Sequence, residues 1–234
     1  MKRPMLFVAL DGMGLDEAKT RKTLQIAHEL HRTGLPFGFK VNLDYVLEYG
    51  VEFAVNEFSL LEGRELFVDL KMWNGKRTMA AVLRKLSDLE VTYVTVHALA
   101  DTELAKAIAE SGKLSPKVAA TTVLTHYSEE YCQEHFGRSR RNAVVHFANI
   151  AVRRNGCQAI VLPGQYLDDV RHLDVEKIVP GLREEGSFHD GRHEVEVTPT
   201  FAKEHHADVL VCGSPIMANK DPAAALRRIL SAIA

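Results

Sequence analysis

Asp69 and Lys71 stand two residues apart near the end of an apolar run, LFVDLK at residues 66–71. Successive side chains of a β-strand point to opposite faces, so a carboxylate and an ammonium group at this spacing share a face. If that face is exposed, the two charges form an ordinary surface ion pair, worth about 0–1 kcal/mol. If it borders a binding site, the ammonium group can hold an anion and donate a proton to it. The rest of the chain must decide between these interpretations.

Charged and polar residues close most of the other apolar runs as well. They are Asp11, Lys40, His97, Thr125 with His126, Arg183, and Gly213 with Ser214. A buried charge costs several kcal/mol unless it is paired, so lysines and aspartates that alternate around one opening stabilise one another. The same arrangement can hold an anionic substrate against a lysine that donates a proton. We expect His97 to be a packing or supporting residue, as most histidines at such positions are.

The elements that must position these residues alternate along the chain. Eight apolar runs predict strands, at residues 5–10, 36–41, 66–71, 91–97, 117–125, 157–162, 176–180 and 207–213. Helical patterns lie between them, for example at 15–34 and 76–89. A last helix is predicted at 221–234, with Asp221 as its N-cap and Pro222 in the first helical position. Strands that alternate with helices form parallel sheets.

Eight such units in 234 residues predict a (β/α)8 barrel, or TIM barrel, as one domain that covers residues 1–234. A doubly wound open sheet is the alternative topology. The chemistry of a barrel takes place at the carboxyl ends of its strands, which is where the charged residues fall. The polar, glycine-containing segment 183–194 is expected to be a loop and is a candidate lid.

Composition excludes several classes of function. The formal net charge is −2, and acidic and basic residues are mixed along the chain. A nucleic-acid-binding stripe or a polybasic membrane arm is therefore not expected, and no run of about 18 apolar residues predicts a membrane span. The three cysteines, Cys132, Cys157 and Cys212, suit neither a disulfide framework nor a metal cluster. We expect a cytoplasmic protein with no nucleic-acid or membrane partner.

Seven segments, taken in order, resemble the signature segments of the orotidine 5'-phosphate decarboxylase family. They are FVALD (7–11), FKV (39–41), DLKMWNGKRT (69–78), TTVLT (121–125), VPGLR (179–183), VTP (197–199) and ADVLVCGSPI (207–216), the last followed by DP at 221–222. The superfamily also contains hexulose-phosphate synthases and ketogulonate-phosphate decarboxylases. The resemblance implies a (β/α)8 barrel, usually a homodimer with sites at the subunit interface.

The resemblance also implies a reaction, the decarboxylation of orotidine 5'-monophosphate to uridine 5'-monophosphate without a metal or an organic cofactor. In the implied site Lys71 donates the proton and Asp69 lies against the departing carboxylate. The other implied contacts are Asp11 and Lys40 to the ribose, Thr125 to the pyrimidine, and Arg183 with the backbone at Gly213 and Ser214 to the phosphate. Thr78 matches the end of the third signature segment and is a further candidate for substrate binding.

The chain departs from the family pattern at three places. Asn74 stands where the family has a third aspartate, which reaches the site of the partner subunit. Ser214 stands where the family has an arginine that binds phosphate, and His193 stands where it has a glutamine that does so. Arg192 or His193 is our candidate for the missing cation. An Arg192→Ala, His193→Ala double variant should then lose affinity for phosphate esters, and unchanged affinity would refute this hypothesis.

These departures leave three possible functions open. The first is a divergent orotidine 5'-phosphate decarboxylase with a rebuilt phosphate site. The second is a related barrel enzyme that acts on another sugar or nucleotide phosphate. Metal-using members of that group carry an acid at the end of the second strand, whereas this chain has Lys40 there, which argues against a magnesium site. The third is a non-catalytic protein that binds a nucleotide, although idle buried charges would only destabilise such a fold.

Overall fold

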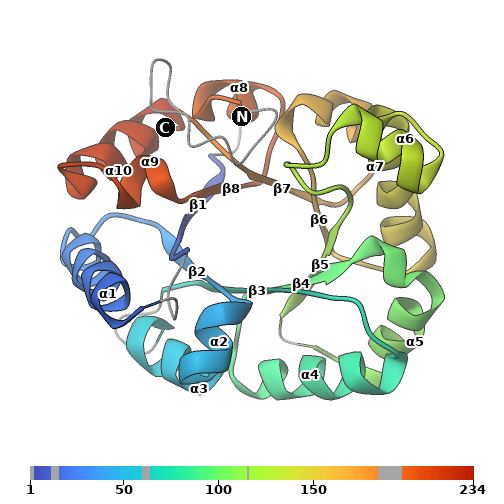
Figure 1. Ribbon diagram of the computed structural model, residues 1–234, viewed down its shortest axis with the longest axis horizontal. Helices are drawn as coiled ribbons and strands as arrows, with labels where there is room; N and C mark the ends of the chain where they lie inside the picture. The colour runs from blue at the N-terminus through green and yellow to red at the C-terminus, as the bar shows by residue number, and fades with distance from the viewer. Residues whose placement is uncertain (1–2, 12–15, 60–63, 115, 184–196) are drawn as a thin grey trace.

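Eight parallel strands follow one another around a closed barrel, and helices surround it (Figure 1). The computed structural model describes residues 3–11, 16–59, 64–114, 116–183 and 197–234. The strands are β1 (Met5–Ala9), β2 (Gly38–Asn42), β3 (Leu66–Met72), β4 (Tyr93–His97), β5 (Lys117–Thr121), β6 (Ala159–Val161), β7 (Glu176–Pro180) and β8 (Val209–Cys212). The ring closes because β8 pairs in parallel with β1, with Met5 opposite Val209. The predicted (β/α)8 barrel is confirmed, and the open-sheet alternative is wrong.

Helices connect successive strands on the outside of the barrel. They are α1 (Glu17–His31), α2 (Leu43–Tyr49), α3 (Val51–Ala54), α4 (Lys76–Asp88), α5 (Asp101–Ser111), α6 (Glu129–Phe136), α7 (Arg140–Asn149), α8 (Pro199–Glu204), α9 (Ser214–Met217) and α10 (Pro222–Ala232). Short 3₁₀ or π segments are η1 (Val55–Ser59), η2 (Ala98–Ala100), η3 (Ile150–Arg154), η4 (Gly164–Tyr166) and η5 (Asp168–Val170). The expected cap of the last helix is present, since the side chain of Asp221 accepts a hydrogen bond from the backbone N–H of Ala224 at 2.8 Å.

Aromatic side chains fill the lower part of the barrel. Phe7, Phe67 and Tyr93 point inward from three strands, and their ring centroids lie 5.5–5.8 Å apart. Alternate residues of the same strands face outward and pack under the helices, as Val8 and Val68 do. This aromatic layer separates the interior of the barrel from its amino end, so the cavity at the carboxyl ends of the strands is closed below.

Strand boundaries differ from the sequence prediction at β5 and β2. The run 117–125 reads as one strand, yet β5 ends at Thr121 because its neighbours end there: His97 of β4 and Val161 of β6 are its last partners. β2 continues to Asn42, one residue beyond the predicted run, because it pairs with Asp69 of β3.

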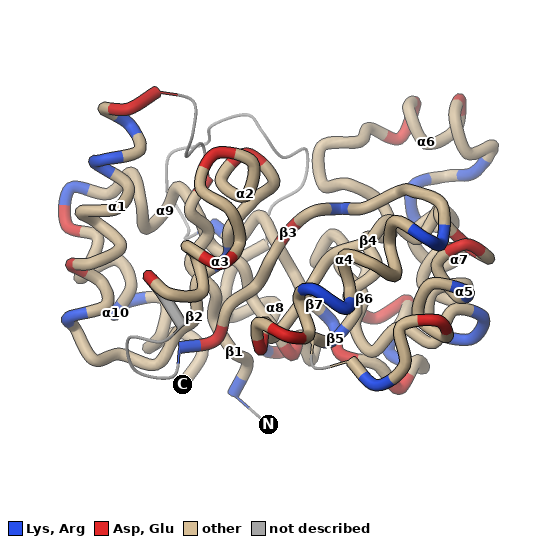
Figure 2. The backbone as a smooth tube through the Cα atoms, turned by 90° about the horizontal axis from the view of Figure 1, so that it is seen from below, with Lys and Arg blue, Asp and Glu red and all other residues tan. Residues whose placement is uncertain are grey.

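Charge on the outer surface is mixed, as the composition predicts. Lys and Arg alternate with Asp and Glu over the outer helices (Figure 2). Among the described residues, no helix is both long enough and apolar enough to cross a membrane.

Candidate active site

A cavity of about 510 Å³ opens at the carboxyl ends of the strands. Eight of the residues predicted from the sequence line it: Asp11, Lys40, Asp69, Lys71, Thr125, Arg183, Gly213 and Ser214. Asn74 and Thr78 are exposed and do not line this cavity in the part of the chain that is described. His193, Arg192 and nearly all of the candidate lid lie outside the described residues.

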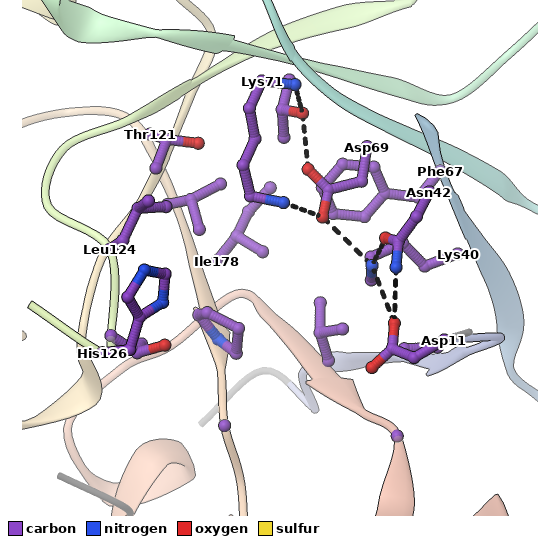
Figure 3. Close-up of a pocket in the computed structure, with 18 of the residues that line it drawn as sticks. Asp11, Lys40, Asn42, Phe67, Asp69, Lys71, Thr121, Leu124, His126 and Ile178 are labelled. Carbon is purple, nitrogen blue, oxygen red and sulfur yellow. Dashed lines mark hydrogen bonds and ion pairs between the residues drawn. The ribbon is translucent and has the colours of Figure 1, made fainter. Parts of the chain in front are cut away.

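Asp69 is the centre of the charged cluster in this cavity (Figure 3). Its Oδ2 atom accepts hydrogen bonds from Nζ of Lys71 at 2.7 Å and from Nζ of Lys40 at 3.0 Å. Its Oδ1 atom accepts one from the hydroxyl of Thr95 at 2.6 Å. The side chains of Asp69 and Lys40 are only 9% and 8% exposed, so their ion pair is buried, and Lys71 pairs with the same buried carboxylate from the cavity side. The first of the two interpretations of Asp69 and Lys71 is therefore wrong.

Burial and charge act against each other on the ionisable groups of this cluster. Burial raises the pKa of Asp69, but the two lysines and the hydrogen bonds from Lys71 and Thr95 lower it well below its usual range. Burial lowers the pKa of Lys40, but the carboxylates of Asp69 and Asp11 outweigh it, so the pKa is raised. Both residues are therefore charged at neutral pH, and the charge of each depends on the other.

Lys71 occupies an irregular part of β3. The register between β3 and β4 shifts between Val68 and Met72, and Lys71 has a φ of 46°, in the left-handed region that side chains other than glycine rarely adopt. Its backbone N–H donates to the hydroxyl of Thr95 at 2.8 Å, which holds this conformation. The side chain of Lys71 is 40% exposed, so its ammonium group faces the cavity while it stays paired with Asp69. Such strained residues concentrate at functional sites.

Asn42 belongs to the cluster, although the sequence analysis did not identify it. Its Nδ2 atom donates to Oδ1 of Asp11 at 2.8 Å, and its Oδ1 atom accepts from Nζ of Lys40. The direct contact between Lys40 and Asp11 is longer, at 3.5 Å, so the amide links the two charges. A signal was present in the sequence, because Asn42 follows Lys40 by two residues and so shares its face of the strand.

The opposite wall of the cavity comes from β5, β7 and β8. Arg183 is buried, and its Nη1 atom donates to the carbonyl of Leu182 at 3.0 Å. Gly213 lies so close to Asp11 that a Cβ atom there would stand 3.0 Å from a carboxylate oxygen, which explains the glycine. The carbonyl of Thr125 accepts a hydrogen bond from the buried guanidinium of Arg140 at 2.7 Å, which fixes the segment after β5.

Two histidines lie near the cluster in different settings. His97 is buried behind the cavity, against Trp73, with 5.9 Å between ring centroids. Burial and the charge of Lys71 lower its pKa to about 4, so it is neutral at pH 7, in keeping with the supporting role expected for it. His126 lines the cavity, and burial with the charges of Lys71 and Arg140 lowers its pKa as well.

Comparison with known proteins agrees with the fold and identifies the family. Residues 4–229 match the model of the orotidine 5'-phosphate decarboxylase / HUMPS family. The protein named orotidine 5'-phosphate decarboxylase from Aquifex aeolicus is 31% identical over 232 residues, covering 95% of each chain. Its namesake from Nautilia profundicola is 28% identical over 228 residues, covering 94% of this chain and 97% of the relative.

Solved structures give the same result. The crystal structure of orotidine 5'-phosphate decarboxylase from Lactobacillus acidophilus superposes with a TM-score of 0.76 at 25% identity and covers 99% of both chains. An uncharacterised conserved protein from Geobacillus kaustophilus shares the fold, with a TM-score of 0.77 at 20% identity over 98% of this chain and all of the other. Because the family model matches almost the whole chain, the chain belongs to the orotidine 5'-phosphate decarboxylase / HUMPS family.

Proposed function

We propose that this protein decarboxylates orotidine 5'-monophosphate to uridine 5'-monophosphate and carbon dioxide. The observation that carries the proposal is the buried cluster in which Asp69 is paired with both Lys40 and Lys71 at the cavity. Membership of the family and the names of its relatives support the same reaction.

The cluster suits a reaction in which a carbon atom gains an electron pair. The bond from the pyrimidine ring to its carboxylate breaks, carbon dioxide leaves, and the electron pair stays on the ring carbon. The ammonium group of Lys71 then gives its proton to that carbon and recovers one from water. Asp69 repels the substrate carboxylate and holds Lys71 in place before the reaction begins. Charges fixed in advance are an effective way to stabilise such a transition state, because nothing must reorganise.

The rest of the cavity offers a place for each other part of the nucleotide. Asp11 and Lys40 stand where the ribose hydroxyls would lie in this proposal, and Thr125 contacts the pyrimidine. Arg183 and the backbone at Gly213 and Ser214 hold the phosphate. Binding energy from a phosphate far from the reacting carbon can be used to orient the ring and to close a lid. The cavity, at about 510 Å³, is within the usual range for small-molecule sites.

Lys40 favours this reaction over metal-assisted chemistry on a sugar phosphate. Its ammonium group lies 3.0 Å from Asp69, so a positive charge already pairs with the carboxylate that a divalent cation would need as a ligand. Within the described ranges, no three His, Cys, Asp or Glu side chains are grouped as metal ligands. The proposed reaction needs no cofactor.

We also propose a cytoplasmic homodimer with its sites at the interface. Four large apolar side chains are exposed on α2, α3 and the segment after β3: Leu43, Leu47, Phe53 and Trp73. A second copy of the chain would cover them. Asn74, next to Trp73, lies outside the cavity of its own chain and would reach the cavity of the partner. The three cysteines are buried and free, which suits a reducing compartment.

The decisive experiment is an ultraviolet assay of the purified protein with orotidine 5'-monophosphate. We expect loss of substrate absorbance in the wild type and at least a thousandfold slower loss in Lys71→Ala, because a proton donor contributes about 10²–10⁴-fold and Lys71 also supplies charge. Lys85→Ala is the matched control, since Lys85 lies on the exposed face of α4, paired with Glu52. Absence of turnover at high enzyme concentration, or equal activity in Lys71→Ala, would refute the proposal.

A further inference from the structure

One buried hydroxyl group at the cavity has no hydrogen-bond partner among the described residues. It belongs to Thr121, the last residue of β5, which lines the cavity and is only 1% exposed. A hydroxyl group that loses water on burial must recover a hydrogen bond or cost free energy, and most buried polar side chains in folded proteins do recover one. This exception therefore needs an explanation.

Two neighbouring threonines have hydroxyl groups that find hydrogen-bond partners within the protein. Thr122, the next residue, faces away from the barrel interior and donates to the carbonyl of Val161 at 2.9 Å. Thr95, on β4, donates to Asp69 at 2.6 Å. Both are as buried as Thr121. Thr95 lines the cavity as Thr121 does, yet among these three hydroxyl groups only that of Thr121 lacks a partner in the described residues.

The position of Thr121 explains why the surrounding residues offer its hydroxyl group no hydrogen bond. Ala119, two residues earlier on β5, belongs to the apolar cluster inside the barrel, so Thr121 points inward as well. Val161 and Ile178, its neighbours in the cavity wall, have apolar side chains that offer no acceptor. In Figure 3 the hydroxyl oxygen is turned toward Lys71, across the pocket from Asp11. Among the described residues no group takes this hydrogen bond, so a molecule in the cavity, water or substrate, is the partner open to it.

We propose that Thr121 donates a hydrogen bond to the carboxylate of the substrate and is a specificity-determining residue of this site; the inference rests on the function proposed above. Asp69 has both oxygens occupied and repels a second carboxylate, so the substrate carboxylate must find its donors elsewhere. Lys71 supplies one and Thr121 supplies the other. The product lacks the carboxylate, so this contact exists only before decarboxylation and helps the site to distinguish substrate from product.

Binding to a protein that cannot turn over its substrate tests the proposal. In the Lys71→Ala background, isothermal titration should give a dissociation constant for orotidine 5'-monophosphate about tenfold higher after Thr121→Val, equivalent to about 1.4 kcal/mol. Affinity for uridine 5'-monophosphate should not change. Thr121→Ser, which keeps the hydroxyl, should retain most of the affinity for the substrate, and Thr122→Val is the control for a lost buried hydroxyl that does not face the cavity.

Steady-state kinetics of Thr121→Val, with Lys71 intact, provide a second readout. We expect KM to rise about tenfold with kcat nearly unchanged, because the hydrogen bond is made in the bound substrate and kept in the transition state, before carbon dioxide has left. Equal weakening of substrate and product, a change below twofold, or the same effect in Thr121→Ser would overturn the role of Thr121 and leave the proposed function intact. Absence of turnover by the wild type together with absence of binding to the Lys71→Ala protein would overturn both proposals.

Discussion

Lys40 and Asp69 depend on each other more strongly than either depends on Lys71, because both of their side chains are buried. Removal of one partner from a buried pair costs about 3–5 kcal/mol, whereas replacement of both by apolar residues is often neutral or stabilising. We therefore expect Lys40→Met to lower the free energy of unfolding by about 3 kcal/mol. The double variant Lys40→Met, Asp69→Leu should recover most of that loss and remain inactive. Urea denaturation of the three proteins measures the difference.

That result would mean that the buried charges serve the reaction at the expense of stability. If the double variant were less stable than Lys40→Met, the ion pair would instead be a net source of stability. Lys85→Met, in an exposed pair on α4, is the matched control and should change stability by less than about 1 kcal/mol.

His97 should make the protein less stable in mild acid. Its pKa is about 4 in the folded chain, compared with about 6.5 when unfolded, so between these values the unfolded state binds more protons. Protonation of His97 therefore costs no stability well above pH 6.5. Between about pH 6.5 and pH 4 the free energy of unfolding falls by about 1.4 kcal/mol for each pH unit, which amounts to about 2 kcal/mol at pH 5. Urea denaturation at pH 7 and pH 5 should reveal this loss in the wild type and a smaller one in His97→Gln.

The loss of stability that remains in His97→Gln would come from His126 and His146, because their pKa values are also lowered in the folded protein. Asp69 does not contribute in this range, because a carboxylate with a lowered pKa loses its stabilising effect only below about pH 4. Equal losses in the wild type and in His97→Gln would contradict the assignment.

Among the elements, β2 has the most direct effect on the site through its final residue. Its extension to Asn42 lets one amide hold Asp11 and Lys40 together. We expect Asn42→Ala to lower kcat/KM about tenfold. Hydrogen bonds to charged groups contribute about 1.5–3 kcal/mol, and water in the variant replaces part of that contribution. Asn142→Ala, on the exposed face of α7, is the control and should leave kcat/KM unchanged. Wild-type kinetics in Asn42→Ala would show that Asp11 and Lys40 hold their positions without the amide.

Element boundaries show where prediction from the sequence stopped. Alternating apolar runs were enough to predict the barrel, since each run needs a hydrophobic neighbour on both faces. They were not enough to predict that β5 ends at Thr121, because this depends on where β4 and β6 end. The irregular backbone at Lys71 was equally hidden, since its cause is the hydroxyl of Thr95 on the next strand. Contacts between strands, rather than patterns within them, decide such details.

At the scale of the whole molecule, two copies of the chain should associate through the exposed apolar side chains of Leu43, Leu47, Phe53 and Trp73. Light scattering should give twice the mass of one chain for the wild type. Leu47→Glu, at a side chain that is 77% exposed on α2, should give the mass of one chain and lose activity, because a charge at an apolar interface is costly. Gln25→Glu places the same charge on α1 and should leave the dimer intact. A wild-type protein with the mass of a single chain would refute the homodimer.

Much of the candidate site could also be predicted from the sequence, because the barrel brings the carboxyl ends of distant strands together. Asp11 and Ser214 are far apart in the chain, and both line one cavity. Asn42 and Thr121 were missed for a physical reason: an amide or a hydroxyl becomes notable only when its partners, or their absence, can be seen. Asn74 could not be placed because its proposed position concerns a second chain.

Closure of the barrel has a consequence for folding during synthesis on the ribosome. Met5 of β1 pairs with Val209 of β8, so the first strand to be made waits for the last. At about 5–20 residues per second, that wait is about 10–40 seconds. During this interval one edge of β1 is unpaired, and the charged side chains of Lys40 and Asp69 are not yet fully buried. An open strand edge invites pairing with other chains. A nascent chain of this protein therefore needs protection from its neighbours until β8 emerges, and any truncation before that strand leaves the edge open for chaperones and proteases to recognise.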